Sequence, residues 1–197
     1  RDFGPITENY LLKQRAIHPD TLKKKEFIGL IKEAPVKMPN DKVIYNTAFI
    51  KRDINNKHLG FVSHFYSRKT ENNQKRVFQL DTPGINRSNV FSDSKDLYIA
   101  ESTPDFISHF ELKKPKNAVY ASLQGGASPY EIEEIYTLFQ TLNKNHPNNV
   151  SINSITDNDF QVYFYDLNIA IAFHNFKNPN KFIEQVHSIK EYIFIFH

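Results

Sequence analysis

Residues 97–105, with the sequence LYIAESTPD, begin the part of the chain that decides the fold. A short apolar run ends at Glu101, and apolar residues at helical spacing follow it. The alternation continues to residue 155, with strands predicted at 97–100, 118–123 and 150–155 and helices at 103–112 and 128–142. Strands that alternate with helices are typical of a parallel sheet covered by helices on both faces. We therefore expect an α/β fold from residue 97 onward.

The flanking parts of the chain carry weaker patterns. Toward the carboxyl end, helices are predicted at 163–173 and at 181–196, with strand character in the last four residues. The amino-terminal half mixes both kinds of element, with a helix predicted at 7–17, a shorter one from Asp20 or Thr21 to 25, and strands at 43–50, 57–66 and 77–80. Asn55-Asn56 is the expected turn between the first two of these strands, and residues 70–75 are an expected loop.

Composition limits the class of protein. The 197 residues are 40% hydrophobic and include 17 Phe and 10 Tyr, which is enough for a core. The longest apolar runs are too short to cross a bilayer and no secretory signal is recognisable, so we expect no membrane partner. The absence of cysteine excludes disulfides, zinc ribbons and thiol nucleophiles and fits a cytoplasmic location. The sequence contains no Walker loop for ATP, no two histidines at the i, i+4 spacing of a zinc site, and no Gly-x-Ser-x-Gly motif of a serine hydrolase.

The charges are distributed unevenly. Residues 1–90 hold 17 Lys and Arg against 9 Asp and Glu, a net charge of +8, whereas residues 91–197 hold 8 against 13, a net charge of −5. A basic half joined to an acidic half suggests a polyanion on one side and a cation on the other. Chance clustering on a solvated surface is the competing interpretation.

Acidic and glycine residues follow the three predicted strands of the second half. Glu101 follows the first strand, Gly125-Gly126 the second, and Asp157 and Asp159 the third. Ligands of parallel α/β sheets bind beyond the carboxyl ends of the strands, and alternation would point both aspartates to one side. Oxygen-only ligands suit Mg²⁺ or Mn²⁺. An Asx turn or helix cap at 157–159, and a simple capping role for Glu101, stay open as alternatives.

These segments resemble the toprim domain shared by bacterial-type DNA primases and topoisomerases. The stretch 97–105 resembles the glutamate motif, 121–126 (ASLQGG) the small-residue turn after the next strand, and 155–159 (ITDND) the paired-aspartate motif. Residues 10–22, 46–53 and 57–61 resemble the primase polymerase core. The resemblance runs from about residue 9 to 175 and is closest to primase-like proteins of conjugative and mobilisable elements.

The resemblance implies two parts, a basic α+β amino-terminal subdomain at residues 1–92 and a toprim domain at 93–197. It implies a metal ligand or general acid/base at Glu101, metal ligands at Asp157 and Asp159, and supporting roles for Asp105, Gly125 and Gly126. The ion would be Mg²⁺ or Mn²⁺. The candidates for holding single-stranded DNA are Arg15, Lys51, Arg52, Arg68 and Arg76. The partners implied are single-stranded DNA, nucleotides and other replication or mobilisation proteins.

Three functions remain open at this point. The first is primase-type nucleotidyl transfer on single-stranded DNA. The second is a non-catalytic nucleic-acid-binding module, because Ser102 stands where the family has glycine and Gln161 and Val162 replace the glycine expected after Asp159. The third is a toprim nuclease, since cutting and joining use the same ion chemistry.

Overall fold

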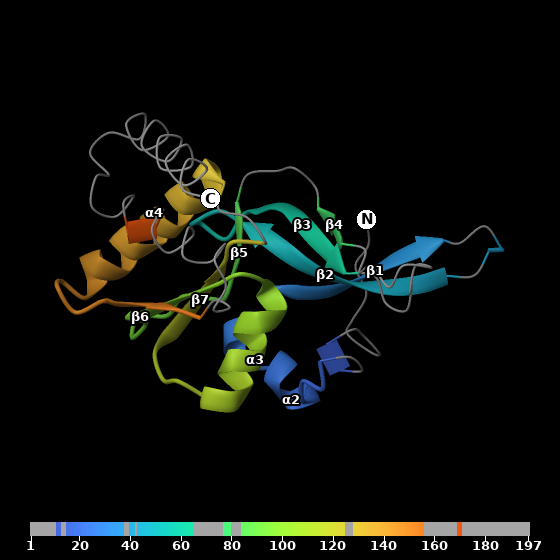
Figure 1. The fold of residues 1–197 in the computed structure, drawn as a ribbon, viewed down its shortest axis with the longest axis horizontal. Coiled ribbons are helices and arrows are strands. Elements are labelled where there is room, and N and C mark those ends of the chain that lie inside the picture. The colour runs from blue at the N-terminus through green and yellow to red at the C-terminus, as the bar shows by residue number, and fades with distance from the viewer. Residues whose placement is uncertain are drawn as a thin grey trace, which may run out of the picture.

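A computed structural model of the chain describes residues 11–12, 15–37, 40–41, 43–64, 77–79, 84–124, 128–155 and 169–170. These residues form an α/β fold around one mixed sheet (Figure 1). The amino-terminal half contributes α2 (Pro19–Leu22), the 3-10 helix η1 (Lys25–Phe27), β1 (Ile31–Lys37), β2 (Val43–Arg52), β3 (His58–His64), β4 (Val77–Gln79) and β5 (Ile85–Arg87). The second half contributes β6 (Asp96–Ala100), α3 (Thr103–Lys113), β7 (Ala118–Ser122), α4 (Pro129–Asn145) and β8 (Ser151–Ser154).

The described strands form one eight-stranded sheet in the order β4-β3-β2-β5-β7-β6-β8, and β1 also pairs with β2. The strands of the second half are parallel, since β6 pairs in parallel with β7 on one side and with β8 on the other. Every pairing of β1 to β5, and that of β5 with β7, is antiparallel. The predicted parallel sheet of the second half is confirmed, as are its three strands and two helices.

The two helices of the second half cover opposite faces of the parallel strands. On one face, Phe106 and Ile107 of α3 pack in a cluster with Ala100 and Tyr120 of β6 and β7. On the other face, α4 packs in a cluster with the alternate strand residues, among them Ile99 and Ala121. Because successive side chains of a strand point to opposite faces, one sheet supplies both cores.

The first half differs from expectation in two strands. β1 was not predicted, because Pro35 and two lysines interrupt its apolar pattern; its pairing with β2 alone is typical of a strand that contains proline. β5 was also missed, since three residues are too few to show alternation. The strands predicted around the Asn55-Asn56 turn and at 77–80 are present as β2, β3 and β4.

The predicted amino-terminal helices begin or end elsewhere. Within the described residues, only 11–12 of the span 7–17 are helical, and Ala16 has a φ of +53°, which ends any helix before that point. α2 begins at Pro19, one residue before Asp20 and two before Thr21, the two predicted caps. Its cap is His18, whose Nδ1 accepts a hydrogen bond from the Asp20 N–H at 3.2 Å. Sequence reasoning missed this because histidine is an uncommon cap.

α4 begins as the sequence predicts. Ser128 caps it, the Ser128 hydroxyl accepts from the Glu131 N–H, and the Glu131 carboxylate accepts from the Ser128 N–H, which completes a capping box. Among the described helices, none is long and apolar enough to cross a bilayer. The predicted loop at 70–75 and helix at 181–196 lie outside the described residues, and of the helix predicted at 163–173 only residues 169–170 are described, which are helical.

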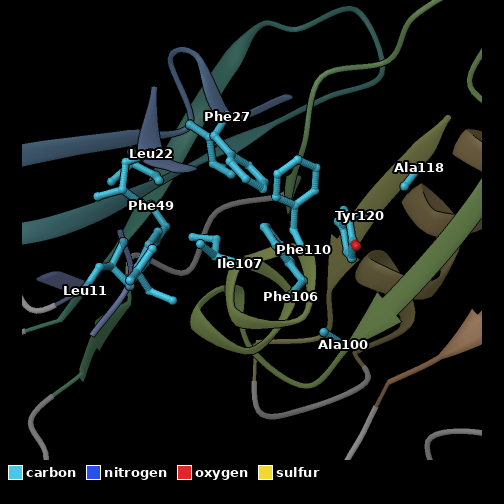
Figure 2. Packing of buried hydrophobic residues seen from close by; sticks show 13 residues of the cluster. Leu11, Leu22, Phe27, Phe49, Ala100, Phe106, Ile107, Phe110, Ala118 and Tyr120 are labelled. Carbon is cyan, nitrogen blue, oxygen red and sulfur yellow. The ribbon is translucent and has the colours of Figure 1, made fainter. Parts of the chain in front are cut away.

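The largest apolar cluster joins the two halves of the chain. Leu22, Phe27 and Phe49 come from the first half and pack against Phe106 and Tyr120 of the second (Figure 2). The rings of Phe27 and Phe106 stack with their centroids 6.2 Å apart. The two subdomains were expected to meet between residues 92 and 93. Residues from both sides of this position share the apolar cluster and belong to the same sheet.

β5 is a very short strand that is held by its side chains. The Arg87 guanidinium is 1% exposed and donates to the backbone oxygens of Asp53, Ile54 and Ser88 and to Asn56 Oδ1, at 2.9–3.1 Å. Burial, followed by the nearby charge of Arg52, lowers the pKa of Arg87 to about 10, and the carboxylates of Glu134 and Asp53 oppose the shift. The guanidinium therefore ties β5 to the turn between β2 and β3.

We expect Phe49→Ala to destabilise the whole chain. Phe49 is fully buried in the cluster that both halves share, so its truncation should lower the free energy of unfolding by about 3–5 kcal/mol. Chemical denaturation followed by circular dichroism should show a single unfolding transition, which the substitution shifts as a whole to lower denaturant concentration. Leu112→Ala, at a residue that is 79% exposed, is the control and should change the free energy by less than about 0.5 kcal/mol. Two separate transitions, of which Phe49→Ala moves one, would contradict the shared core.

The His109 imidazole should make stability depend on pH. Burial, followed by the charge of Lys113, lowers the pKa of His109, and its Nδ1 lies 2.9 Å from the Tyr120 hydroxyl. The folded state thus binds this proton less readily than the unfolded state, so the stability that His109 contributes is present above its ordinary pKa of 6.5 and is lost as the pH falls. His109→Gln should therefore lose less stability than the unmodified chain between pH 7.5 and 5. An equal loss in both proteins would refute this, and exposed His58→Gln is the control.

Candidate functional site

Glu101 stands where the carboxyl ends of three parallel strands meet. It directly follows β6, the strand that lies between β7 and β8. The neighbouring strands stay paired with β6 up to this point: the Leu123 N–H donates to the Ala100 oxygen and the Ile155 N–H to the Ile99 oxygen, both at 2.9 Å. The chain therefore leaves all three strands at the same edge, and Glu101 lies at its centre.

This edge is also the point where the connections diverge. The chain that leaves β6 enters α3, on the face of the Phe106 cluster. Ile169, the described helical residue that comes after β8 in the sequence, is buried in the cluster of α4 on the opposite face. Ligands of α/β sheets bind beyond the carboxyl ends of the strands, where the chain continues from adjacent strands toward opposite faces. Glu101 occupies the corresponding position directly after β6.

Ser122 connects Glu101 to the end of β7. The Ser122 hydroxyl donates to the backbone oxygen of Glu101 at 3.3 Å and accepts from the N–H of Gln124 at 3.1 Å. Gln124 adopts a φ of +55°, the left-handed region that favours glycine. It stands immediately before the glycine pair, so the change of backbone conformation begins one residue earlier than the sequence suggests.

A row of polar residues runs across the sheet to this edge. Lys51 of β2 is opposite Asn86 of β5, Asn86 is opposite Ser122 of β7, and Ser122 is opposite Ala100, the residue before Glu101. Directly opposite residues point to the same face of a sheet. With neighbouring strands about 4.8 Å apart, the backbone of Lys51 is roughly 14 Å from that of Ala100. The sheet thus aligns a cation of the basic half with the acidic edge.

The two candidate DNA-binding residues on β2 are both buried, Lys51 at 3% exposure and Arg52 at 4%. The Arg52 guanidinium donates to Asn89 Oδ1 at 2.8 Å and to the Ile28 oxygen at 3.2 Å, and burial lowers its pKa. It also occupies the space beside Gly29, where a Cβ atom would come within 2.7 Å of its Nη2. As the chain is folded, Arg52 stabilises the turn after η1 and presents no charge to solvent.

Arg15 and Asp105, two further candidates, are brought together. Arg15 Nη2 lies 3.4 Å from Asp105 Oδ1 at the start of α3, and the Ser102 hydroxyl donates to the other carboxylate oxygen of Asp105. The amino-terminal segment thus reaches the beginning of α3, the end of the helix that follows Glu101 in the sequence. Arg15 and Asp105 are partly exposed, at 34% and 38% of their side chains.

The other candidates fall outside the described residues: Gly125, Gly126, Asp157, Asp159, Arg68 and Arg76. Within the described ranges, no three His, Cys, Asp or Glu side chains are close enough to hold a metal ion. Sequence reasoning missed Ser122, Gln124 and Asn86, and for Gln124 the glycine pair that follows was the available signal. Comparison of the chain with family models, with curated proteins and with solved structures finds no match.

The Arg15–Asp105 pair should contribute little to folding. Both side chains are partly exposed, and ion pairs of this kind contribute about 0.2–1 kcal/mol. A double-mutant cycle with Arg15→Gln and Asp105→Asn, read by chemical denaturation, should give a coupling energy below about 1 kcal/mol that shrinks further at high salt. A larger, salt-independent coupling would show that the pair is structural.

Proposed function

We propose that this chain is a primase-like toprim protein that transfers nucleotides onto an oligonucleotide on single-stranded DNA. The observation that carries the proposal is the position of Glu101 at the diverging carboxyl ends of β6 and β8. Asp157 and Asp159 follow Ile155 by only two and four residues, and the Ile155 N–H bonds to β6 beside Glu101. In the sequence, the three acids of the toprim pattern therefore closely follow β6 and β8, two parallel strands that end at the same edge of the sheet.

The donors at this edge suit a hard dication. Glu101, Asp157 and Asp159 offer only carboxylate oxygens, so they would hold Mg²⁺ or Mn²⁺, which stabilises the attacking and leaving oxygens of phosphoryl transfer. In the proposed reaction the terminal hydroxyl oxygen of a nucleotide forms a bond to the α-phosphorus of an incoming nucleoside triphosphate, and pyrophosphate leaves. Glu101 is the group that accepts the hydroxyl proton.

The basic half supplies the cations for the template strand. Arg15, which is partly exposed, lies beside the start of α3, whereas Lys51 and Arg52 are buried as the chain is folded. Arg68 and Arg76 are assigned the same role on sequence grounds. Phosphate contacts of this kind position a strand without reading its sequence. The proposal further includes a cytoplasmic location, partner proteins of replication or mobilisation, and close backbone approach at Gly125-Gly126.

We expect Glu101→Gln to abolish oligonucleotide synthesis. With single-stranded DNA, the four ribonucleoside triphosphates and Mn²⁺ or Mg²⁺, the unmodified chain should extend products that a gel resolves, and the variant should lose at least 100-fold in rate. Asp157→Asn and Asp159→Asn should behave alike. Glu133→Gln, at an exposed residue of α4, removes the same charge elsewhere and should keep full activity. Inactivity of the unmodified chain with every ion and template would refute the proposal.

The same samples test the two other functions. A binding module would bind single-stranded DNA in a mobility-shift assay. This binding would weaken with added salt but would not change with Mg²⁺ or in Asp157→Asn. A nuclease would nick the template in the absence of nucleotides, and Glu101→Gln would prevent it.

A further inference from the structure

Gln124 carries two unfavourable features at the edge of the sheet that holds Glu101. Its φ of +55° is a conformation that residues with a side chain rarely adopt. Its amide nitrogen and oxygen are both buried, and neither has a hydrogen-bond partner in the described part of the chain. Buried polar groups without partners are uncommon in native proteins and destabilise the fold. Glycine at this position would remove both features, so folding does not explain the presence of glutamine.

A second unpartnered group lies in the adjoining position of the polar row. Asn86 is 1% exposed; its Nδ2 donates to the Phe49 oxygen at 3.0 Å, which fixes the amide, but its Oδ1 has no partner among the residues that the structure describes. Asn86 is opposite Ser122, and the Ser122 hydroxyl accepts from the Gln124 N–H. Asn86 and Gln124 are thus both neighbours of one serine, Asn86 as its cross-strand partner and Gln124 through its backbone N–H, and the hydroxyl of this serine donates to the backbone of Glu101.

The chemistry of these groups selects the ligand. The unused atoms are two carbonyl oxygens, which need donors, and one NH₂ group, which needs an acceptor. A phosphate offers acceptors and would leave the carbonyl oxygens unpaired. The hydroxyls of a sugar and the amino and ring nitrogens of a base offer both kinds of group. The matching ligand is therefore the uncharged, nucleoside part of a nucleotide.

We propose that Gln124 binds the nucleoside part of the incoming nucleotide and holds it beside Glu101. This inference rests on the proposed function, since it assigns the nucleotide to the same edge of the sheet. The three side-chain torsions of glutamine allow the amide to turn toward the ligand while the backbone stays on Ser122. Asn86 Oδ1 is the neighbouring acceptor. Binding supplies the partners that the free chain lacks, and the unfavourable backbone of Gln124 serves to place its amide.

The test separates stability from binding. Gln124→Gly should raise the melting temperature of the unliganded chain by a few degrees, because it relieves the backbone and removes the unpaired amide. The same variant should bind ATP with Mg²⁺ about tenfold more weakly by calorimetry, because it lacks the amide hydrogen bonds. Gln124→Asn keeps the amide, so its affinity for ATP should lie between those of the unmodified chain and Gln124→Gly. Asn148→Gly is the matched control: Asn148 has a φ of +56° at an exposed turn, so its replacement should leave ATP affinity unchanged.

Further ligands identify the part of the nucleotide that Gln124 contacts. The affinity for adenosine should fall in Gln124→Gly by the same factor as the affinity for ATP. Tripolyphosphate and Mg²⁺ alone should each bind the variant as tightly as they bind the unmodified chain. Equal ATP affinity in the two proteins, no ATP binding by the unmodified chain, or a loss confined to tripolyphosphate or Mg²⁺ would overturn the inference.

The outcome is separable from that of the proposed function. If the unmodified chain makes no oligonucleotide but its ATP affinity depends on Gln124, the inference stands and the proposed reaction fails. If the chain makes oligonucleotides and Gln124→Gly binds ATP with unchanged affinity, the proposed reaction stands and the inference about Gln124 fails.

Discussion

The structure depends on the pairing of β5 with strands from both halves of the chain. β5 has three residues, of which two pair with β2 and two with β7. Backbone hydrogen bonds of so short a strand are too few to hold a sheet together, and its side chains add to them. Asn86 donates to the backbone of Phe49, and Arg87 binds the backbone at Asp53, Ile54 and its neighbour Ser88. A buried guanidinium surrounded by carbonyl oxygens is well solvated by the protein, which offsets part of the cost of its burial.

This junction determines what can meet at the candidate site. Because β5 lies between β2 and β7, the basic half is attached at the side of the parallel strands and reaches their carboxyl ends through the row from Lys51 to Ser122. α3 also contacts the first half, among other places through the Phe27 and Phe106 rings and through Arg15 and Asp105. These contacts join the basic half and the acidic half of the chain within one sheet and one core.

The sequence was most informative where the pattern of apolar residues is long and regular. The strands and helices from β6 to β8 were predicted to within a few residues, because buried parallel strands and amphipathic helices leave clear periodicities. β1 and β5 were missed because a proline and a length of three residues hide any alternation. The cap at His18 was missed because it depends on local geometry rather than on residue preference.

The candidate site shows the same division. Glu101 was placed correctly at a strand end, since position along a strand follows from the sequence. The burial of Arg52 and the polar row were not predictable, because they depend on which strands become neighbours. The contact of Arg52 with Asn89 and the pairing of β2 with β5 both join residues more than 30 positions apart. The backbone of Gln124 was not predictable either, because residues with a side chain such as glutamine rarely adopt a positive φ.

The placement of β6 has a consequence for synthesis of the chain on the ribosome. β6 is synthesised before both of the strands that pair with it. It can pair with β7 once about 20 more residues have been made, but its other edge stays unpaired until β8 is made, about 50 residues after β6. During that interval an apolar strand has one open edge, and open edges can pair with other chains. Slow translation between residues 100 and 155 would therefore favour aggregation of the nascent protein.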